Sequence, residues 1–296
     1  MKGDETLAEK REVFMKDMTW PEIKERLGKT DIAMIPAGQT EQHGHHLPID
    51  VDNFICTGIA QRVAEATLNS AAPVVAPTIP FGYSDIPYFR DYPGTFSLQG
   101  DTLVNVYVDI AKSLVRMGFK KIIFINGHYP NPPFIDEAIR RVTKETGAFM
   151  ALCNFFIIPA QEVSQILTEQ GQPPVWGHAC LIETSVSEVF GAVVREDKLQ
   201  ASLPSGFPKE LADFVPVSPA GITIPAYEYK KTAHCQWLGG PENGAGPQGT
   251  PHGYSKDIGE RVIKATVEPI VKLMEDIKDM PVELNPEFVQ HEKVRG

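Results

Sequence analysis

The segment from residue 37 to residue 53, AGQTEQHGHHLPIDVDN, concentrates side chains that can bind a metal ion or transfer a proton. It contains three of the chain's eight histidines, together with Glu41 and Asp52. Imidazole nitrogens and carboxylate oxygens together suit zinc, manganese or iron. A polar loop whose aspartates cap a following helix is the simpler explanation of the same residues, so this segment alone leaves both interpretations open.

Two further fragments carry the same kinds of side chain. His128 follows an apolar run in KKIIFINGHYPN (120–131), and His178 and Glu183 lie in WGHACLIETS (176–185). Three separate clusters of histidine and acidic residues are difficult to explain by chance. Together they predict a metal site.

The elements that must position these residues alternate between strands and helices. Asp52 or Asn53 would cap the first long helix, and Asp101 would cap the second. Alternation of this kind predicts a single α/β domain over residues 1–296, with a mainly parallel sheet flanked by helices. Ligands bind beyond the carboxyl ends of the strands in such sheets. The expected strands are 31–38, 73–80, 120–127 and 147–154, and the expected helices are 54–69, 101–118, 133–147 and most of 255–278.

Composition excludes several classes of function. The net charge of −10 leaves no basic face for nucleic acid or anionic lipid. The N-terminus lacks an apolar signal core, and no apolar run reaches the ~18 residues of a membrane span. The four cysteines form no C-x-x-C pair, so free thiols in the cytoplasm are expected. The Gly- and Pro-rich stretch 196–252 is expected to be a long excursion that covers a site or makes a subunit contact.

The three fragments resemble the creatininase family of metal-dependent amidohydrolases. They are similar, in order, to the family's G-x-x-E-Q-H-G-x-H-L-P-x-x-x-D, N-G-H-x-x-N and H-x-x-x-x-E-T-S motifs. A weaker similarity lies at GTPHGYSKDIG (249–259). The matching residues are Gly38, Glu41, Gln42, His43, Gly44, His46, Leu47, Pro48, Asp52, Asn126, Gly127, His128, Asn131, His178, Glu183, Thr184 and Ser185.

The resemblance implies a creatininase-like α/β/α fold and a two-metal centre. Glu41, Asp52 and His128 would hold one ion, and His43 and Asp52 would hold the other, with Asp52 as the bridge. Zinc is the expected metal, with manganese or iron as alternatives. Paired ions can activate water and polarise a carbonyl group.

The resemblance also implies that His178 is catalytic and carries a proton to the leaving group. Glu183 would be an outer partner of the ligands or a ligand itself. The family's usual glutamate two residues after the N-G-H histidine is Pro130 here. Either the second ion is weak or absent, or another carboxylate replaces the missing one. Glu183 is the first candidate, and Asp50 is the second.

The substrate implied by the resemblance is small, polar and cyclic. Creatininases carry a tryptophan where this chain has Phe155 and Phe156, and Trp176 lies two residues before His178 rather than four. A cyclic amide or a keto-inositol such as 3-dehydro-scyllo-inosose is therefore expected in place of creatinine. The candidate substrate-binding residues are Tyr129, Trp176 and Tyr83, with further polar side chains in FGYSDIPYFRDYPG (81–94).

Two reaction classes follow from these observations. The main expectation is a metal-dependent hydrolase in which water attacks a carbonyl carbon and a C–N or C–C bond opens. The rival is a non-catalytic protein that keeps the fold and binds a metal and a small ligand. The resemblance also implies a homo-oligomer, commonly a hexamer.

Two other signals carry little weight. GAGPQG (244–249) matches G-x-G-x-x-G, but it contains proline and follows no strand. Cys180 lies two residues after His178, which suggests a thiol nucleophile, although a buried structural cysteine is the simpler expectation.

Overall fold

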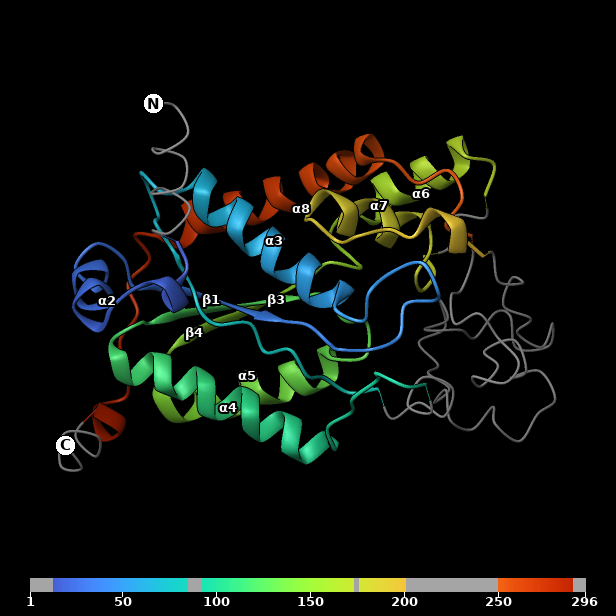
Figure 1. The fold of residues 1–296 in the computed structure, drawn as a ribbon. Coiled ribbons are helices and arrows are strands. Elements are labelled where there is room, and N and C mark those ends of the chain that lie inside the picture. The colour runs from blue at the N-terminus through green and yellow to red at the C-terminus, as the bar shows by residue number, and fades with distance from the viewer. Residues whose placement is uncertain (1–12, 85–91, 173–175, 201–249, 290–296) are drawn as a thin grey trace, which may run out of the picture.

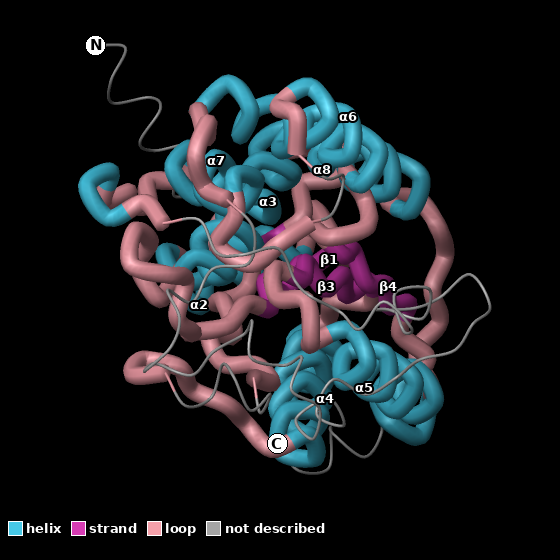
Figure 2. Tube along the Cα trace, turned by 90° about the vertical axis from the view of Figure 1, so that its right-hand side faces the viewer, coloured by secondary structure: helices cyan, strands magenta, loops and turns pink. Residues whose placement is uncertain are grey.

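The computed structural model of the chain describes residues 13–84, 92–172, 176–200 and 250–289. Its centre is a sheet of four parallel strands in the order β2-β1-β3-β4. Figure 2 shows this sheet between two layers of helices. Every residue of β1 and β3 is buried, as expected for the apolar strands of a parallel sheet. The strands are β1 (Ile32–Ala37), β2 (Val74–Val75), β3 (Lys121–Asn126) and β4 (Phe149–Asn154).

Helices cover both faces of the sheet (Figure 1). Helices α3, α6, α7 and α8 pack on one face around one hydrophobic cluster, and α4 and α5 pack on the other face around a second cluster. This arrangement confirms the expected single α/β domain. The helices are η1 (Met15–Asp17), α2 (Trp20–Leu27), α3 (Val51–Ala66), α4 (Gly100–Met117), α5 (Pro132–Thr146), α6 (Ala160–Glu169), α7 (Leu181–Val189), η2 (Glu196–Lys198) and α8 (Lys256–Ile277).

The central strands end level with one another. Ala37 of β1 pairs with Asn126 of β3, which pairs in turn with Asn154 of β4. The chain therefore leaves β1 and β3 at one edge of the sheet. The loop 38–50 and the turn 127–131 begin there, so their side chains can meet.

The predicted helix starts were partly wrong. The N-cap of α3 is Asp50, so Asp52 lies inside the first turn rather than at the cap. The N-cap of α4 is Gln99, and Asp101 lies in its first turn. Because Asp52 does not cap the helix, its carboxylate is available for other contacts.

Three helices were not anticipated from the sequence, namely α2, α6 and α7. Helix α2 begins with a capping box formed by Thr19 and Glu22. Helix α7 carries Glu183 in its first turn. Of the expected excursion at 196–252, residues 201–249 lie outside the described part of the chain, and so does the whole GAGPQG stretch.

Two expectations about composition can be compared with the structure. Within the described ranges, none of the helices combines the length and the apolar character needed to cross a membrane. Cys56, Cys153 and Cys180 are free thiols and all three are buried. Cys235 lies outside the described residues.

Candidate metal centre

Five ionisable side chains converge at the carboxyl ends of β1 and β3. Glu41 and His43 come from the loop after β1, Asp52 from the first turn of α3, His128 from the turn after β3, and Glu183 from the first turn of α7. None of the five is more than 3% exposed to solvent. Acidic side chains are almost never buried to this extent without a partner.

The five side chains form two groups of possible metal ligands that share one carboxylate. The first group is Glu41, Asp52 and His128, and the second is His43, Asp52 and Glu183. Within each group, one ligand atom from every residue lies within 4.8 Å of the others. Asp52 is common to both groups, as a bridging ligand would be.

The ring of His43 is oriented by a backbone carbonyl. Its Nδ1 lies 3.1 Å from the carbonyl oxygen of Glu41, which can only accept a hydrogen bond. In neutral His43 the proton is therefore on Nδ1, and the Nε2 lone pair points away from that carbonyl. Nε2 lies 3.3 Å from Asp52 Oδ1 and 3.7 Å from Glu183 Oε2.

His128 is oriented in the same way through its other nitrogen. Its Nε2 lies 3.0 Å from the carbonyl oxygen of Tyr83, so in neutral His128 the lone pair is on Nδ1. That atom lies 2.9 Å from Asp52 Oδ2 and 3.5 Å from Glu41 Oε1. In its neutral form, each imidazole would therefore present one unprotonated nitrogen to the carboxylates.

Two atoms at the centre of this arrangement are buried without a hydrogen-bond partner. They are His43 Nε2 and Asp52 Oδ2. The 2.9 Å contact of Asp52 Oδ2 with His128 is an ion pair rather than an aligned hydrogen bond. Buried polar atoms without partners are rare in folded proteins and require an explanation. A divalent cation bound by these atoms would supply it, so the donor set fits a metal.

Burial and mutual repulsion disturb the protonation of the carboxylates. Burial raises the pKa of Glu183 to about 7. Burial also raises the pKa of Glu41. Burial would raise the pKa of Asp52 as well, but the neighbouring His43 and His128 imidazoles hold it well below its usual range.

The carboxylates in turn favour a cation at His43. Burial alone would lower the pKa of this imidazole, but the charges of Asp52, Glu183 and Glu41 raise it to about 10. The negative charges that favour a proton on His43 would also favour a metal ion beside it. Protons and metal ions therefore compete for the site.

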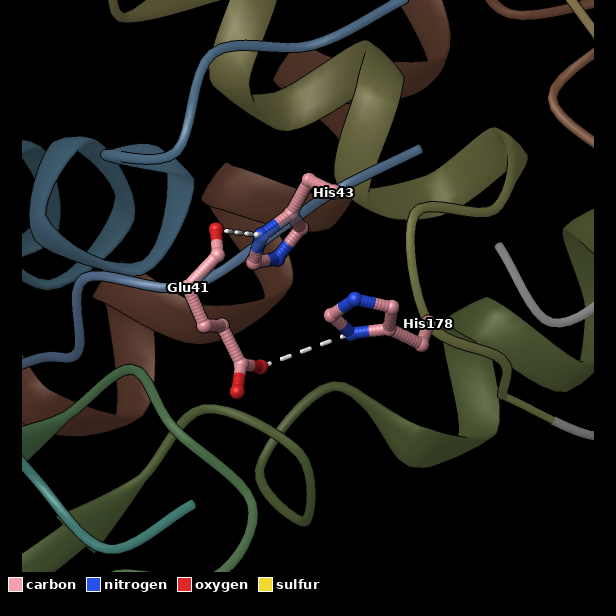
Figure 3. A group of neighbouring side chains, drawn as sticks. All are labelled: Glu41, His43 and His178. Carbon is pink, nitrogen blue, oxygen red and sulfur yellow. Dashed lines mark hydrogen bonds and ion pairs between the residues drawn. The ribbon is translucent and has the colours of Figure 1, made fainter. Parts of the chain in front are cut away.

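His178 lies close to Glu41 and His43, as Figure 3 shows. Its Nε2 lies 2.6 Å from the carbonyl oxygen of Gln42, and its Nδ1 lies 3.6 Å from Glu41 Oε1. The centres of the His178 and His43 rings are 4.2 Å apart. Burial and the charge of His43 keep the pKa of His178 well below its ordinary value, so this imidazole is neutral. Glu41, His43 and His178 also form a third group of possible ligands.

Asp50 and Pro130 do not contribute donors to these groups. Asp50 is exposed at the start of α3, where it accepts a hydrogen bond of 2.7 Å from Asn53. Pro130 lies in the turn after β3 and has no side-chain donor. Of the two carboxylates considered as replacements, only Glu183 lies among the ligand groups.

The aromatic residues expected to bind substrate lie in two separate clusters. The Trp176 ring packs edge-on against Phe155 and Phe156, at 4.9 and 5.2 Å. Tyr129 packs against Phe156 at 5.7 Å and is 52% exposed. The ring of Tyr83 instead packs on Phe134 of α5 at 4.8 Å. Residues 85–91, which hold the other polar candidates of that segment, lie outside the described residues.

Cys180 is unsuited to act as a nucleophile. The thiol is only 4% exposed, and burial raises its pKa to about 11. At neutral pH it is therefore protonated, whereas a nucleophilic cysteine reacts as the thiolate.

Sequence reasoning missed Ser84 and Gln39, which lie behind Glu41. Ser84 is fully buried and its hydroxyl lies 2.6 Å from Glu41 Oε2. Gln39 is also fully buried and contacts Ser84. Neither residue has a spacing or a neighbour in the sequence that would indicate such a contact.

Comparison with protein families gives an independent finding. The family model described as "Creatininase: Creatinine amidohydrolase" matches residues 16–274. The chain is 30% identical to the creatinine amidohydrolase of Pseudomonas putida over 229 residues, which cover 73% of this chain and 85% of that protein. It is 35% identical to the 3-dehydro-scyllo-inosose hydrolase of Thermotoga maritima over 117 residues, 39% of this chain and 36% of that one.

Solved structures agree with this finding. A structure titled "Creatininase Mn" is similar with a TM-score of 0.71 and 26% identity, over 90% of this chain and 99% of that chain. A mutant creatininase described as the Zn-Zn type is similar with a TM-score of 0.71 and 27% identity, over 90% of this chain and 98% of that chain.

Proposed function

Because the chain belongs to the creatininase family of hydrolases, we propose that it is a two-metal hydrolase. The first ion is held by Glu41, Asp52 and His128, and the second by His43, Asp52 and Glu183. The observation that carries the proposal is the pair of buried, unpartnered atoms His43 Nε2 and Asp52 Oδ2. These atoms lie where the two ligand groups meet.

In this proposal Glu183 replaces the donor that is missing at Pro130. Its Oε2 is 3.7 Å from His43 Nε2, and the residue is buried in the first turn of α7. A carboxylate that only caps a helix is normally exposed to solvent. The burial of Glu183, which raises its pKa to about 7, is better explained by a cation beside it.

The bound ions would polarise a carbonyl group of the substrate and lower the pKa of a water toward neutral. Zinc is the metal that we propose, because imidazole and carboxylate are among its usual ligands, with manganese and iron as alternatives. Each ion would receive three protein ligands. This leaves a coordination position open, as catalytic sites do and closed structural sites do not, and so favours a hydrolase over a non-catalytic binding protein.

His178 would move the proton in this reaction. Its Nε2–H is held by the Gln42 carbonyl, so its Nδ1 lone pair faces the ligand groups. Because its pKa is low, the imidazole is free to accept a proton from water and deliver it to the leaving group. The role of a metal ligand is the alternative for this residue.

We propose a small, polar, cyclic substrate, either a cyclic amide or a keto-inositol. The similarity to a creatinine amidohydrolase and to a 3-dehydro-scyllo-inosose hydrolase supports both classes. Trp176 and Tyr129 are the side chains that we expect to contact it. Incubation of the purified protein with creatinine, other cyclic amides and keto-inositols would separate the classes, since turnover of the amides alone would exclude the inositol.

The experiment that tests the metal centre is metal content per subunit, measured by mass spectrometry on freshly purified protein. We expect two ions in the wild type and one in Glu183→Gln. Glu188→Gln, on the same helix but outside the ligand groups, is the matched control and should keep two. One ion in both the wild type and Glu183→Gln would exclude the second site as proposed.

The oligomeric state of the protein and its location in the cell stay predictions. The family resemblance predicts a homo-oligomer, commonly a hexamer. Light scattering on the eluted protein would determine the number of subunits.

A further inference from the structure

Ser84 and Gln39 form a buried chain of hydrogen bonds behind Glu41. The hydroxyl oxygen of Ser84 lies 2.6 Å from Glu41 Oε2 and contacts the side-chain nitrogen of Gln39. All three residues are at most 1% exposed. Because these groups are shielded from water, each donor and acceptor must hydrogen-bond to another group of the protein.

Backbone groups fix the orientation of the Gln39 amide. Its Oε1 accepts hydrogen bonds from the N–H of Thr40 at 2.9 Å and from the N–H of Gly82 at 2.8 Å. Its Nε2 donates to the carbonyl of Phe96 at 2.7 Å. A flipped amide would place nitrogen against two N–H groups and oxygen against a carbonyl, so the assignment is unambiguous.

This orientation sets the direction of the Ser84 hydroxyl. Because Gln39 Nε2 can only donate, Ser84 Oγ must accept from it. The single hydroxyl proton is then available to Glu41 Oε2. His128 Nε2 lies 3.2 Å from the same Ser84 oxygen, so one hydroxyl contacts two residues of the first ligand group.

The consequence for Glu41 is that its two oxygens have different roles. Oε2 is held by Ser84, while Oε1 faces His128 Nδ1 at 3.5 Å and His178 Nδ1 at 3.6 Å. A carboxylate held in this way offers one oxygen to a cation, and it keeps the same rotamer when no cation is bound. Within the described part of the chain, neither Ser84 nor Gln39 hydrogen-bonds to His43 or Glu183 of the second group.

We propose that Ser84, oriented by Gln39, is a positioning residue for the first ion and not for the second. The inference rests on the proposed two-metal function. Outer partners of metal ligands typically change metal affinity by about 10- to 100-fold when they are removed. The expected effect is therefore selective for one of two sites that share Asp52.

Zinc binding by Ser84→Ala tests this selectivity, with a chromophoric chelator as competitor. The substitution is made in two backgrounds that each retain one site: His43→Ala keeps the first ligand group, and His128→Ala keeps the second. Ser187→Ala, which removes an equally buried hydroxyl from α7, is the matched control. Thermal unfolding of each metal-free variant establishes that it is folded at the assay temperature.

We expect Ser84→Ala to weaken zinc binding about 10- to 100-fold in the His43→Ala background and to leave it within about threefold in the His128→Ala background. Ser187→Ala should change neither. Equal losses in both backgrounds would assign Ser84 a general structural role and overturn the inference, and so would no loss in either. A wild type that binds no zinc would instead refute the proposed function itself.

Discussion

Under the proposed function, Glu183 would combine two functions that usually belong to different residues. Its Oε2 accepts a hydrogen bond of 2.5 Å from the N–H of Ala179, which satisfies a backbone donor at the start of α7. The same oxygen lies 3.7 Å from His43 Nε2. The helix terminus therefore fixes the position of a carboxylate that a metal site needs. The chain accepts a positive φ of 52° at Ala179 in this turn, which is uncommon for a residue other than glycine.

His178 can be distinguished from the ligands by a single substitution. If it transfers a proton, His178→Ala should lower kcat by about 10²- to 10⁴-fold and leave two ions per subunit. The reason is that its Nδ1 faces the ligand groups while neither of the two groups that share Asp52 needs it. Metal content and kcat on the same preparation provide the measurement.

The exposed neighbour His45 provides the control for that experiment. His45→Ala should retain both kcat and two ions. Loss of an ion from His178→Ala would instead make His178 a ligand, through the group that it forms with Glu41 and His43.

At the scale of elements, apolar runs and helix ends differed in how well they could be predicted. The strands at 31–38, 120–127 and 147–154 were predicted within two residues at each end, because each is a continuous apolar run. Burial is continuous in β1 and β3, whereas most residues of β4 are only partly buried. The helix N-caps were less predictable, because several adjacent acidic or amide side chains could cap the same helix. Helix α7 was missed because it is buried nearly all round and so has no polar face to reveal its period.

The contact between α7 and α8 leaves no room for a side chain at Gly259. A Cβ there would lie 2.4 Å from the carbonyl oxygen of Ser185. Alanine normally stabilises a helix interior by about 1 kcal/mol relative to glycine. Overpacking against backbone costs about 1–3 kcal/mol, so we expect Gly259→Ala to lower the free energy of unfolding by up to about 2 kcal/mol. Urea denaturation of the metal-free protein measures it.

Gly58 in α3 offers the matched comparison. A Cβ there would meet the ring of Phe190 at 2.3 Å, but this ring is only partly buried and can move aside. Gly58→Ala should therefore cost less than Gly259→Ala. An equal or larger cost at Gly58 would contradict the argument that backbone contact decides the effect.

At the scale of the whole molecule, the proposed metal ligands come from four segments that are distant in sequence. These segments are the loop after β1, the start of α3, the turn after β3 and the start of α7. Ligand types were predictable from the sequence because the motifs that carry them are long. The hydrogen bonds of Ser84 and Gln39 were not, because they depend on loops that only the folded chain brings together.

Ions that join four segments should stabilise the whole fold. A ligand that binds only the folded state at 100 times its Kd adds about 2.7 kcal/mol to the free energy of unfolding. We therefore expect zinc to raise the thermal unfolding midpoint of the wild type, and a chelator to reverse the rise.

Because Asp52 belongs to both ligand groups, Asp52→Asn should abolish most of the zinc-dependent increment, whatever it does to the metal-free protein. Asp101→Asn, in the exposed first turn of α4, should retain the full increment. An increment of wild-type size in Asp52→Asn would contradict binding at the two groups that share this carboxylate, and would place zinc at the group of Glu41, His43 and His178 or elsewhere on the chain.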